Sequence, residues 1–381
     1  MPRSKPGVPS LLRELNDSAA LSHIMLVGQV TRAELAAHTG LSRVTSSQAL
    51  ARLESLGLVH SGGRRAGARG PAADLYALMP KVGSALGMAL LPDAVRADLC
   101  SLTGEVLASA TIPLGEDVLD ACVKAARAVE EQAGGESGPV HAAVVATPGV
   151  VNPATGDLSF SYDLAQATEL RSELGERLGV PVRLGNDIHL AALAERSEGV
   201  ARGEQDFVLL WMDRGVGMAS VVDGQVRSGH SGAAGEIGYL PVPGVPLPVR
   251  VDNLEQGSFQ RLVGLPAVDE LARRHGVERG APGGSSPAFL MELAQRISLG
   301  VAAVGTILDP ALVVLTGDTA LGFGPGLPEA VAEATSRIAP INPRVAMSTV
   351  GVDGPLVGAR LQALESARAV LIDRVRNSES T

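Results

Sequence analysis

The segment 31–59, TRAELAAHTGLSRVTSSQALARLESLGLV, constrains the fold more than any other part of this chain. Thr31 and Glu34 have the Thr-x-x-Glu spacing of a capping box, which predicts the start of a helix. Gly40 predicts its end, because glycine tolerates the left-handed backbone that closes many helices. Ser42 predicts a second helix start, since its hydroxyl can accept a hydrogen bond from a first-turn amide. The segment is therefore predicted to be two short helices joined by a tight turn.

The flanks of this segment complete a small α+β domain over residues 1–80. Apolar residues recur at roughly helical spacing in 11–28, which predicts a preceding helix. The stretch 57–78, GLVHSGGRRAGARGPAADLYAL, predicts a two-stranded wing with an arginine-rich tip. A helix–turn–helix followed by a wing is a DNA-binding arrangement, in which the second helix, here 42–56, enters the major groove.

The candidate DNA contacts lie on one side of the second helix and at the tip of the wing. Arg43 and Gln48 carry donors that match guanine and adenine edges. Ala49, Leu50 and Leu53 share the opposite side and are expected to pack inward. The predicted set is Ser42, Arg43, Thr45, Ser47, Gln48, Arg64, Arg65 and Arg69. A helix–turn–helix kept only for protein contacts is the alternative, but the wing arginines have no evident acidic partner nearby, which favours DNA.

The charge distribution agrees with a nucleic-acid-binding end on a different kind of body. Residues 1–80 hold nine Lys and Arg against five Asp and Glu, a net charge of +4, whereas the remaining residues carry −13. A basic end favours a polyanionic partner, and we expect double-stranded operator DNA. Chance variation over so short a segment is the alternative explanation of the charge alone.

Composition narrows the remaining classes. The 381 residues predict two or three domains, and 45% hydrophobic residues allow large buried cores. No run of about 18 uncharged apolar residues is present, and the first residues lack the apolar stretch of a signal peptide. We therefore expect a cytoplasmic protein that does not enter a membrane. The two cysteines, Cys100 and Cys122, are too few for a disulfide scaffold and are expected to be packing residues.

The body, residues 81–381, is predicted to be α/β, because strand-like apolar runs alternate with amphipathic stretches. The predicted strands are 140–151, 207–213, 216–226 and 311–318, and the predicted helices lie near 117–133, 168–179, 187–198, 287–307, 326–337 and 354–376. The glycine-rich stretch 278–288 is predicted to be a surface loop.

Six motifs in the body have the order and spacing of one family. They are VVATPGVVNPATGDL, LGVPVRLGNDIHLAALAE, DRGVGMASVVDG, SGAAGEIGYLPV, NLEQGSF and LDPALVVLTGD. Over essentially its whole length the chain resembles the ROK proteins, a family of repressors, open reading frames and sugar kinases. The resemblance implies an actin-like body of the hexokinase and heat-shock ATPase type, with lobes over about 81–185 and 186–381 and a sugar site between them. It also implies a homodimer or higher homo-oligomer.

The candidate ligand residues suit a sugar, whose several hydroxyls need carboxylates and amides held by short turns. Asn186 and Asp187 stand at a predicted strand-to-helix turn, and Glu236 stands in a glycine-rich turn. By the resemblance, Asn186, Asp187, Glu236 and Glu255 occupy sugar-contact positions, and Tyr239 is a candidate hydrogen-bond donor. The alternatives are that the Asn-Asp pair merely caps a helix and that Glu255 is a solvated helix-start residue.

One departure from the family pattern predicts that zinc is absent. Zinc-bearing relatives have histidine after Gly-Glu-Ile-Gly and three cysteines in the loop that follows. Here Tyr239 stands at the histidine position, and the stretch 241–253 contains no cysteine. Since a structural zinc ion needs about four nitrogen or sulfur ligands, we predict no metal. The prolines of this loop are expected to stiffen it instead.

The phosphate-binding loops of the family kinases are also altered, which predicts no ATP and no enzyme activity. Their Asp-x-Gly-Gly-Thr motif corresponds to 89–93, ALLPD, where leucine blocks close approach and proline lacks an amide donor. Asp93, Asp213 and Asp318 stand where phosphates would lie and would repel them. Asp187 matches the family's general base. Without a phosphate donor, we interpret Asp187 as a ligand-binding acid.

The leading hypothesis is therefore a sugar-responsive transcriptional regulator, most simply a repressor, whose winged helix binds operator DNA and whose cleft binds a sugar or sugar derivative. Two alternatives remain. The retained Asp187 motivates a ROK-type sugar kinase with an appended DNA-binding domain. The changes at Tyr239 and in the zinc loop motivate a regulator whose cleft no longer binds sugar.

Overall fold

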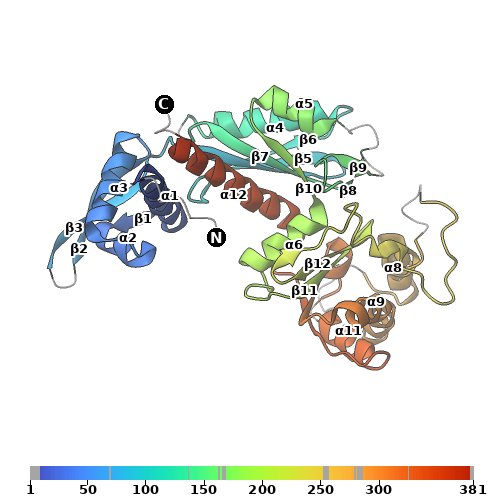
Figure 1. Cartoon of the computed structure of the whole chain (residues 1–381). Coiled ribbons are helices and arrows are strands. Elements are labelled where there is room, and N and C mark those ends of the chain that lie inside the picture. Colours follow the sequence, from blue (N-terminus) through green and yellow to red (C-terminus); the bar gives the residue numbers. More distant parts are fainter. Residues whose placement is uncertain are drawn as a thin grey trace, which may run out of the picture.

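The fold has three parts, a winged helix and two α/β lobes, with a long helix, α12, running from the lobes to the winged helix (Figure 1). It is taken from a computed structural model. The structure describes residues 9–67, 70–135, 137–161, 164, 169–251, 257–278, 280, 286–324 and 326–377.

The winged helix forms as its caps predict. Its elements are α1 (Pro9–Val27), β1 (Gln29–Thr31), α2 (Arg32–Thr39), α3 (Arg43–Ser55), β2 (Val59–Gly67) and β3 (Gly70–Leu78). Thr31 and Glu34 form the reciprocal capping box of α2, Gly40 ends that helix with a φ of 71°, and Ser42 caps α3. The sheet order is β1-β3-β2, so β1 adds a third strand to the predicted two-stranded wing.

The first lobe is a five-stranded sheet with helices on both faces. Its strands are β4 (Ser84–Leu90), β5 (Ala94–Ser101), β6 (Val106–Pro113), β7 (Val140–Thr147) and β10 (Val182–Asn186), in the order β10-β7-β4-β5-β6. Helices α4 (Val118–Gln132) and α5 (Leu170–Leu178) cover one face, and α12 (Gly354–Asn377) covers the other. A small hairpin, β8 (Val150–Val151) and β9 (Leu158–Phe160), follows β7.

The second lobe repeats this layering. Its strands are β11 (Phe207–Met212), β12 (Val216–Val222), β13 (Gln225–Val226), β14 (Leu312–Thr316) and β15 (Arg344–Met347), in the order β13-β12-β11-β14-β15. Helix α6 (Asp187–Glu198) packs on one face of the sheet. The other face carries α8 (Leu265–Arg274), α9 (Pro287–Leu308) and α11 (Leu327–Ser336). Short helical turns complete the lobe: η1 (Ile237–Tyr239), α7 (Gln260–Val263), α10 (Asp318–Leu321) and η3 (Gly351–Asp353).

The predicted strands and helices of the body are all present, with shifted ends. The predicted strand 140–151 is two strands separated by Pro148 and Gly149, and 216–226 is likewise divided by a turn between β12 and β13. The mixed sheets and two-faced helix layers confirm the predicted α/β body.

Helix α12 belongs to the first lobe although it comes last in the chain. The sequence-based division placed everything after 186 in the second lobe, whereas this helix packs on β4 and β7. Two glycines permit the contact. A Cβ added to Gly87 on β4 would lie 2.5 Å from the backbone nitrogen of Arg360, and one added to Gly358 would lie 2.0 Å from the carbonyl oxygen of Leu190 on α6. Helix α12 is therefore held tightly between the first sheet and α6.

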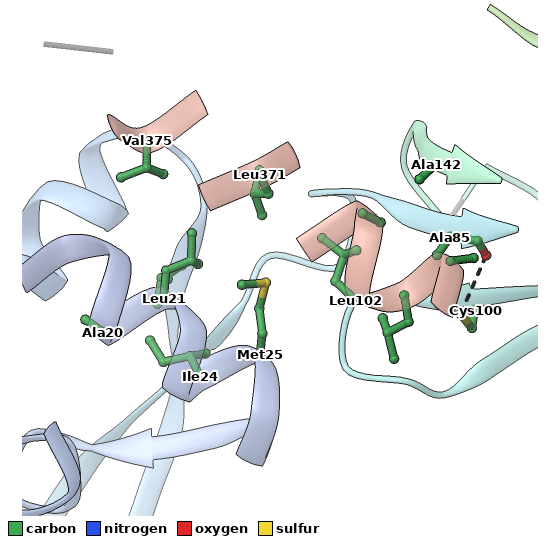
Figure 2. Packing of buried hydrophobic residues seen from close by; sticks show 14 of the residues in the cluster. Ala20, Leu21, Ile24, Met25, Ala85, Cys100, Leu102, Ala142, Leu371 and Val375 are labelled. Carbon is green, nitrogen blue, oxygen red and sulfur yellow. Dashed lines mark hydrogen bonds between the residues drawn. The ribbon is translucent and has the colours of Figure 1, made fainter. Parts of the chain in front are cut away.

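The other end of α12 packs against the winged helix. Figure 2 shows side chains of α1 and α12 side by side in a continuous apolar core that extends to Leu102, Ala85 and Cys100 of the first lobe. We call this contact the α1–α12 junction and define it by Leu21, Ile24, Met25, Leu371 and Val375, each at most 5% exposed.

One side chain adds polar contacts at the α1–α12 junction. Arg368 of α12 donates a hydrogen bond from Nε to the carbonyl of Leu102 and another from Nη2 to the carbonyl of Met25, both at 2.8 Å. Met25 lies in the last turn of α1, where carbonyl groups lack partners within the helix and attract cations. Arg368 thus joins the first lobe, α12 and the winged helix.

Both cysteines are packing residues. Cys100 and Cys122 are buried as expected, and burial raises the pKa of the thiols to about 11 and about 12.

Within the described part of the chain, α9 alone is long and apolar enough to cross a membrane by length and composition. Its Phe289, Leu293 and Ile297 are buried in the core of the second lobe.

Candidate functional site

Helix α3 presents an exposed face and a buried face. Arg43, Val44, Ser47, Gln48 and Ala51 are exposed. The opposite residues, Ser46, Ala49, Leu50 and Leu53, are buried in the core of the winged helix. This confirms the inward packing of Ala49, Leu50 and Leu53, and it leaves Arg43 and Gln48 on an open surface at the start of the helix.

The three predicted hydroxyl contacts on α3 all take part in local hydrogen bonds. The Ser42 hydroxyl accepts a hydrogen bond from the Thr45 amide at 3.1 Å, and the two hydroxyl oxygens lie 2.8 Å apart. The Ser47 hydroxyl donates to the carbonyl of Arg43 at 2.9 Å. These residues therefore shape the start of α3 as well as facing outward.

The expectation that the wing arginines lack nearby acidic partners is wrong. Arg65 lies 2.7 Å from the Glu34 carboxylate, and Arg64 lies 3.4 Å from that of Asp74. Asp74 lies opposite Arg64 on the facing strand of the wing. Glu34 is distant in sequence from Arg65, and folding of the wing onto α2 brings these two together. Hydrogen bonds from Thr31, with a smaller effect of Arg65, hold the pKa of Glu34 below its ordinary value. Arg69 lies outside the described residues.

A cavity of about 340 Å³ lies between the two lobes. In the first lobe it is lined by the turn after β4, by Gly149 after β7, and by Asn186 and Asp187 after β10. In the second lobe it is lined by the β11–β12 turn and by Glu236. Val352 and Pro355, beside the start of α12, complete its wall. Elements that are distant in sequence therefore converge on one cleft.

Asn186 and Asp187 stand at the start of α6, where Asn186 caps the helix, and both also border the cavity. The Asn186 side chain accepts a hydrogen bond from the His189 amide at 2.9 Å, which caps α6, and donates one to the carbonyl of Gly149 at 2.9 Å. A carboxylate oxygen of Asp187 accepts from the Ile188 amide at 2.8 Å. Both residues nevertheless line the cavity. These hydrogen bonds fix the orientation of both side chains beside the cavity.

Glu236 lines the cavity, whereas Tyr239 does not. The Glu236 side chain is open to solvent in the cleft, yet the surrounding protein removes enough water to raise the pKa of its carboxyl above the ordinary value. The prediction of Tyr239 as a ligand contact is wrong for this structure, because the turn η1 carries its hydroxyl into a buried position. Glu255 lies outside the described residues.

The β11–β12 turn is held in place by a buried side chain that the sequence did not single out. Gln260 accepts a hydrogen bond from the Val216 amide and donates one to the carbonyl of Arg214, both at 2.7 Å. Asp213, in the same turn, lines the cavity. Gln260 follows the motif NLEQGSF directly. Its place three residues after Gly257 was the only feature of the sequence that could have drawn attention to it.

The positions that correspond to the kinase phosphate loops have different places in the structure. Leu91 and Pro92 form the β4–β5 turn, closed by a 2.8 Å hydrogen bond from the Leu91 amide to the carbonyl of Ala94, and both line the cavity. Asp93 and Asp318 are exposed and are not among the lining residues. Of the three aspartates expected to oppose phosphates, Asp213 is therefore the one that faces the cleft.

A second missed residue, Glu195 on α6, fixes the loop that leads to the cavity. Its side chain is 1% exposed and accepts hydrogen bonds from the Ser348 hydroxyl, the Val350 amide at 3.0 Å and the Val200 amide at 2.9 Å. The loop it holds continues into η3 and α12. The motif LGVPVRLGNDIHLAALAE ends in this glutamate, but its local sequence did not indicate which loop the side chain holds.

Comparisons with known proteins agree with this architecture. A model of the ROK family matches residues 93–258, and a model of the MarR family matches residues 14–70. The chain is 24% identical over 351 residues to the xylose repressor of Caldicellulosiruptor bescii, covering 84% of this chain and 86% of that protein. The crystal structure of a ROK family transcriptional regulator, a homologue of the E. coli MLC protein, matches with a TM-score of 0.71 at 20% identity, over 96% of this chain and all of that one.

The two family matches fall on different parts of the chain, the MarR match on the winged helix and the ROK match on the two lobes. The bifunctional enzyme NanE/NanK of Brucella suis is 30% identical to the chain over 210 residues, or 55% of this chain. That stretch spans only 38% of the enzyme's length. The relatives of the ROK domain thus include both regulators and enzymes by name, so the cleft geometry has to distinguish them.

Proposed function

We propose that this protein is a sugar-responsive, DNA-binding transcriptional regulator, most simply a cytoplasmic repressor that binds operator DNA as a homodimer. The observation that carries the proposal is the path of α12. Pro355 at one end lines the cleft beside Val352 of η3, while Leu371 and Val375 at the other end pack on α1. A 24-residue helix is about 36 Å long and rigid along its axis, so one element contacts both sites.

Sugar binding in the cleft would act through this helix. A ligand held by Asn186, at the end of β10 in the first lobe, and by Glu236 in the second favours a closed arrangement of the lobes, since it contacts both. Closure displaces α12, and with it the winged helix. In a dimer this changes the distance between the two copies of α3, which must match two operator half-sites. The sugar shifts the equilibrium only as far as its affinities for the two arrangements differ.

The DNA-facing residues are Arg43 and Gln48 at base edges, with Ser42, Thr45 and Ser47 at bases or phosphates. Arg64, Arg65 and, by sequence, Arg69 contribute from the wing. The ion pairs of Arg64 and Arg65 do not oppose this role. Exposed pairs contribute little stability, so a phosphate can replace a carboxylate at small cost.

The cleft supports ligand binding rather than phosphoryl transfer. Leu91 and Pro92 occupy the turn that would have to cradle phosphates, and Asp213 adds negative charge beside it. We therefore propose that the ROK domain is not an enzyme and holds no ATP. We also propose that it holds no zinc, because Tyr239 and a cysteine-free proline loop replace the ligand set.

The test starts with selection of duplexes from a random DNA pool, followed by fluorescence anisotropy at one stated salt concentration. Specific binding that one sugar shifts is the expected result. Gln48→Ala should weaken specific binding by about 1–3 kcal/mol, because a bidentate base contact is lost. Glu333→Gln, on the distant α11, is the matched control. Failure to select any sequence would reject the DNA function, and binding that no sugar shifts would indicate a silent cleft.

A ROK-type sugar kinase with an appended DNA-binding domain is the second candidate. Asp187 lines the cavity at the position of a general base, which is the observation in its favour. Sugar-dependent ATP consumption that disappears in Asp187→Asn would support it. Absence of ATP consumption with every sugar that binds would leave the regulator.

A further inference from the structure

The cleft has a polar end and an apolar end, and strand order defines their separation. In the first lobe Asn186 ends β10, and Leu90 ends β4, with β7 between them. Neighbouring strands lie about 4.8 Å apart, so the two strand ends are separated by about 10 Å. In the second lobe Glu236 lies beside β12, and Trp211 lies on the neighbouring β11.

The polar end of the cleft is formed by both lobes. Gly217, at the start of β12, packs on Ile188 of α6, next to Asp187; a Cβ added there would lie 2.2 Å from that isoleucine. The polar ends of both lobes therefore meet at α6. On the other side, the ion pair between Arg96 of β5 and Asp353 ties the β4–β5 turn to the start of α12.

The apolar end is lined by Leu91, Pro92 and Val352, whereas Trp211 lines the cavity nearer the polar end, because it pairs with Gly217 and packs in the same cluster as Ile188. Val352 is 45% exposed, although nothing in its sequence surroundings requires an apolar side chain to face water. A cluster of accessible apolar side chains in a cavity indicates a ligand-binding surface. A sugar ring alone would leave these apolar side chains in contact with water, because the hydroxyls of the ring form their hydrogen bonds at the polar end.

The charge of the cleft argues against an anionic ligand. Asp187, Asp213 and Glu236 line it together with one cation, Arg214. Removal of water raises the pKa of the Glu236 carboxyl, which shows that the site already disfavours negative charge at this position. A phosphate group would add at least one more negative charge to a partly desolvated acidic site.

We propose that the effector is an uncharged glycoside, with its sugar ring at Asn186, Asp187 and Glu236 and an apolar alkyl or aryl substituent against Leu91, Pro92 and Val352. Sugar phosphates are excluded. This inference rests on the proposed sugar-binding function and specifies the ligand class of the same cleft.

The chain contains a reporter for this proposal. Trp211 is its single tryptophan, and it lines the cavity. A ligand that fills the cavity changes the tryptophan emission directly, so binding can be titrated on the unmodified full-length protein. The probes are matched triplets of common aldohexoses: the free sugar, its 6-phosphate and its phenyl glycoside in both anomers.

The expected result is a Kd at least tenfold lower for one phenyl glycoside than for its free sugar, and no saturable binding of the 6-phosphate. Leu91→Ser should raise the glycoside Kd at least fivefold and so reduce the ratio of the free-sugar Kd to the glycoside Kd. Ile307→Ser, on an 82% exposed position of α9, is the control variant and should leave the ratio unchanged. Thermal shift on the same samples detects any ligand that does not affect the tryptophan.

Equal Kd values for a free sugar and its glycosides would overturn the inference while leaving the sugar-responsive function intact. If a 6-phosphate bound more tightly than its free sugar and its glycosides, the inference would also be overturned, and the sugar-responsive function would again remain. If no probe in any form binds, the inference and the sugar part of the proposed function both fail. DNA binding by the winged helix is tested independently by the selection experiment.

Discussion

The α1–α12 junction and the interlobe cleft are both contacts between separate parts of this chain, yet they are built in opposite ways. The junction is closed by buried leucine, isoleucine, methionine and valine side chains, and its one charged residue, Arg368, binds two carbonyl groups. The cleft encloses about 340 Å³ and is lined by carboxylates at one end and apolar side chains at the other.

This difference assigns different mechanical roles to the two contacts. Burial of apolar surface holds the junction closed without a ligand, so motion of α12 is transmitted to α1. The cleft has unfilled volume and is lined by acids, and under the proposed function a ligand that contacts both lobes closes it. A regulator of this design needs one rigid contact and one contact that a ligand can close.

The largest expected effect comes from breaking the junction. Leu371→Ala removes a side chain that is 3% exposed, and the loss of burial plus the cavity left behind should cost about 2–5 kcal/mol of unfolding free energy. Denaturant titration measures this. Leu26→Ala, on α1 but 71% exposed, is the matched control and should change stability by less than about 0.5 kcal/mol. Equal losses in the two variants would show that the junction is not a packed contact.

A smaller effect is expected from the loop between the cleft and α12. Glu195→Ala leaves the Ser348 hydroxyl and the Val350 and Val200 amides without their acceptor and should cost about 2–3 kcal/mol. Thermal and denaturant unfolding both report it. Glu333→Ala, which removes only an exposed i,i+4 pair, should cost little by comparison. If Glu195→Ala matched that control, the loop would not depend on the buried carboxylate.

A third variant distinguishes coupling from stability. Arg368→Ala leaves the carbonyls of Met25 and Leu102 without this partner and should cost about 1–2 kcal/mol. Its larger effect should be on regulation, because the hydrogen bonds that join the first lobe and α12 to the winged helix are lost. Anisotropy should show near-normal DNA affinity with a weaker effect of the sugar. Full retention of the sugar response would assign transmission to the apolar contacts alone.

The smallest effect, and the only stabilising one, is expected in the cleft. Partial desolvation raises the pKa of Glu236, so the folded state disfavours its ionised form. That penalty is present above the raised pKa and disappears as the pH falls below the ordinary value of 4.5, where the group becomes protonated in both states. Glu236→Gln should therefore raise the melting temperature slightly at pH 7 and lose this gain near pH 4, while sugar affinity falls at both. An equal gain at the two pH values would contradict the assignment to ionisation.

The winged helix was predictable in detail because its determinants are local. The capping box of Thr31 and Glu34, the left-handed Gly40 and the Ser42 cap each act within four residues, and all are confirmed. The wing ion pairs were missed because Arg65 and Glu34 are separated by α3 and meet only after folding.

The candidate site was predictable in part for the same reason. Asn186, Asp187 and Glu236 stand in turns whose sequence marks them, and each lines the cavity. Tyr239 was placed wrongly because a single 3-10 turn decides which way it faces. Gln260 binds Val216, 44 residues away, and Glu195 binds Ser348, 153 residues away. A local sequence pattern cannot indicate contacts over such separations.

The sequence by itself determined the elements of this protein: the capped helices of the winged helix, the apolar strands of two α/β lobes, and the acids in turns at the ends of those strands. Caps, turns and periodicity depend on backbone geometry over a few residues, which is why they can be recognised without coordinates. Only the tertiary structure decided that the last helix returns to the first lobe, and that this one helix contacts both the cleft and α1. Those contacts join residues hundreds of positions apart, and they are selected by which apolar faces can be buried together.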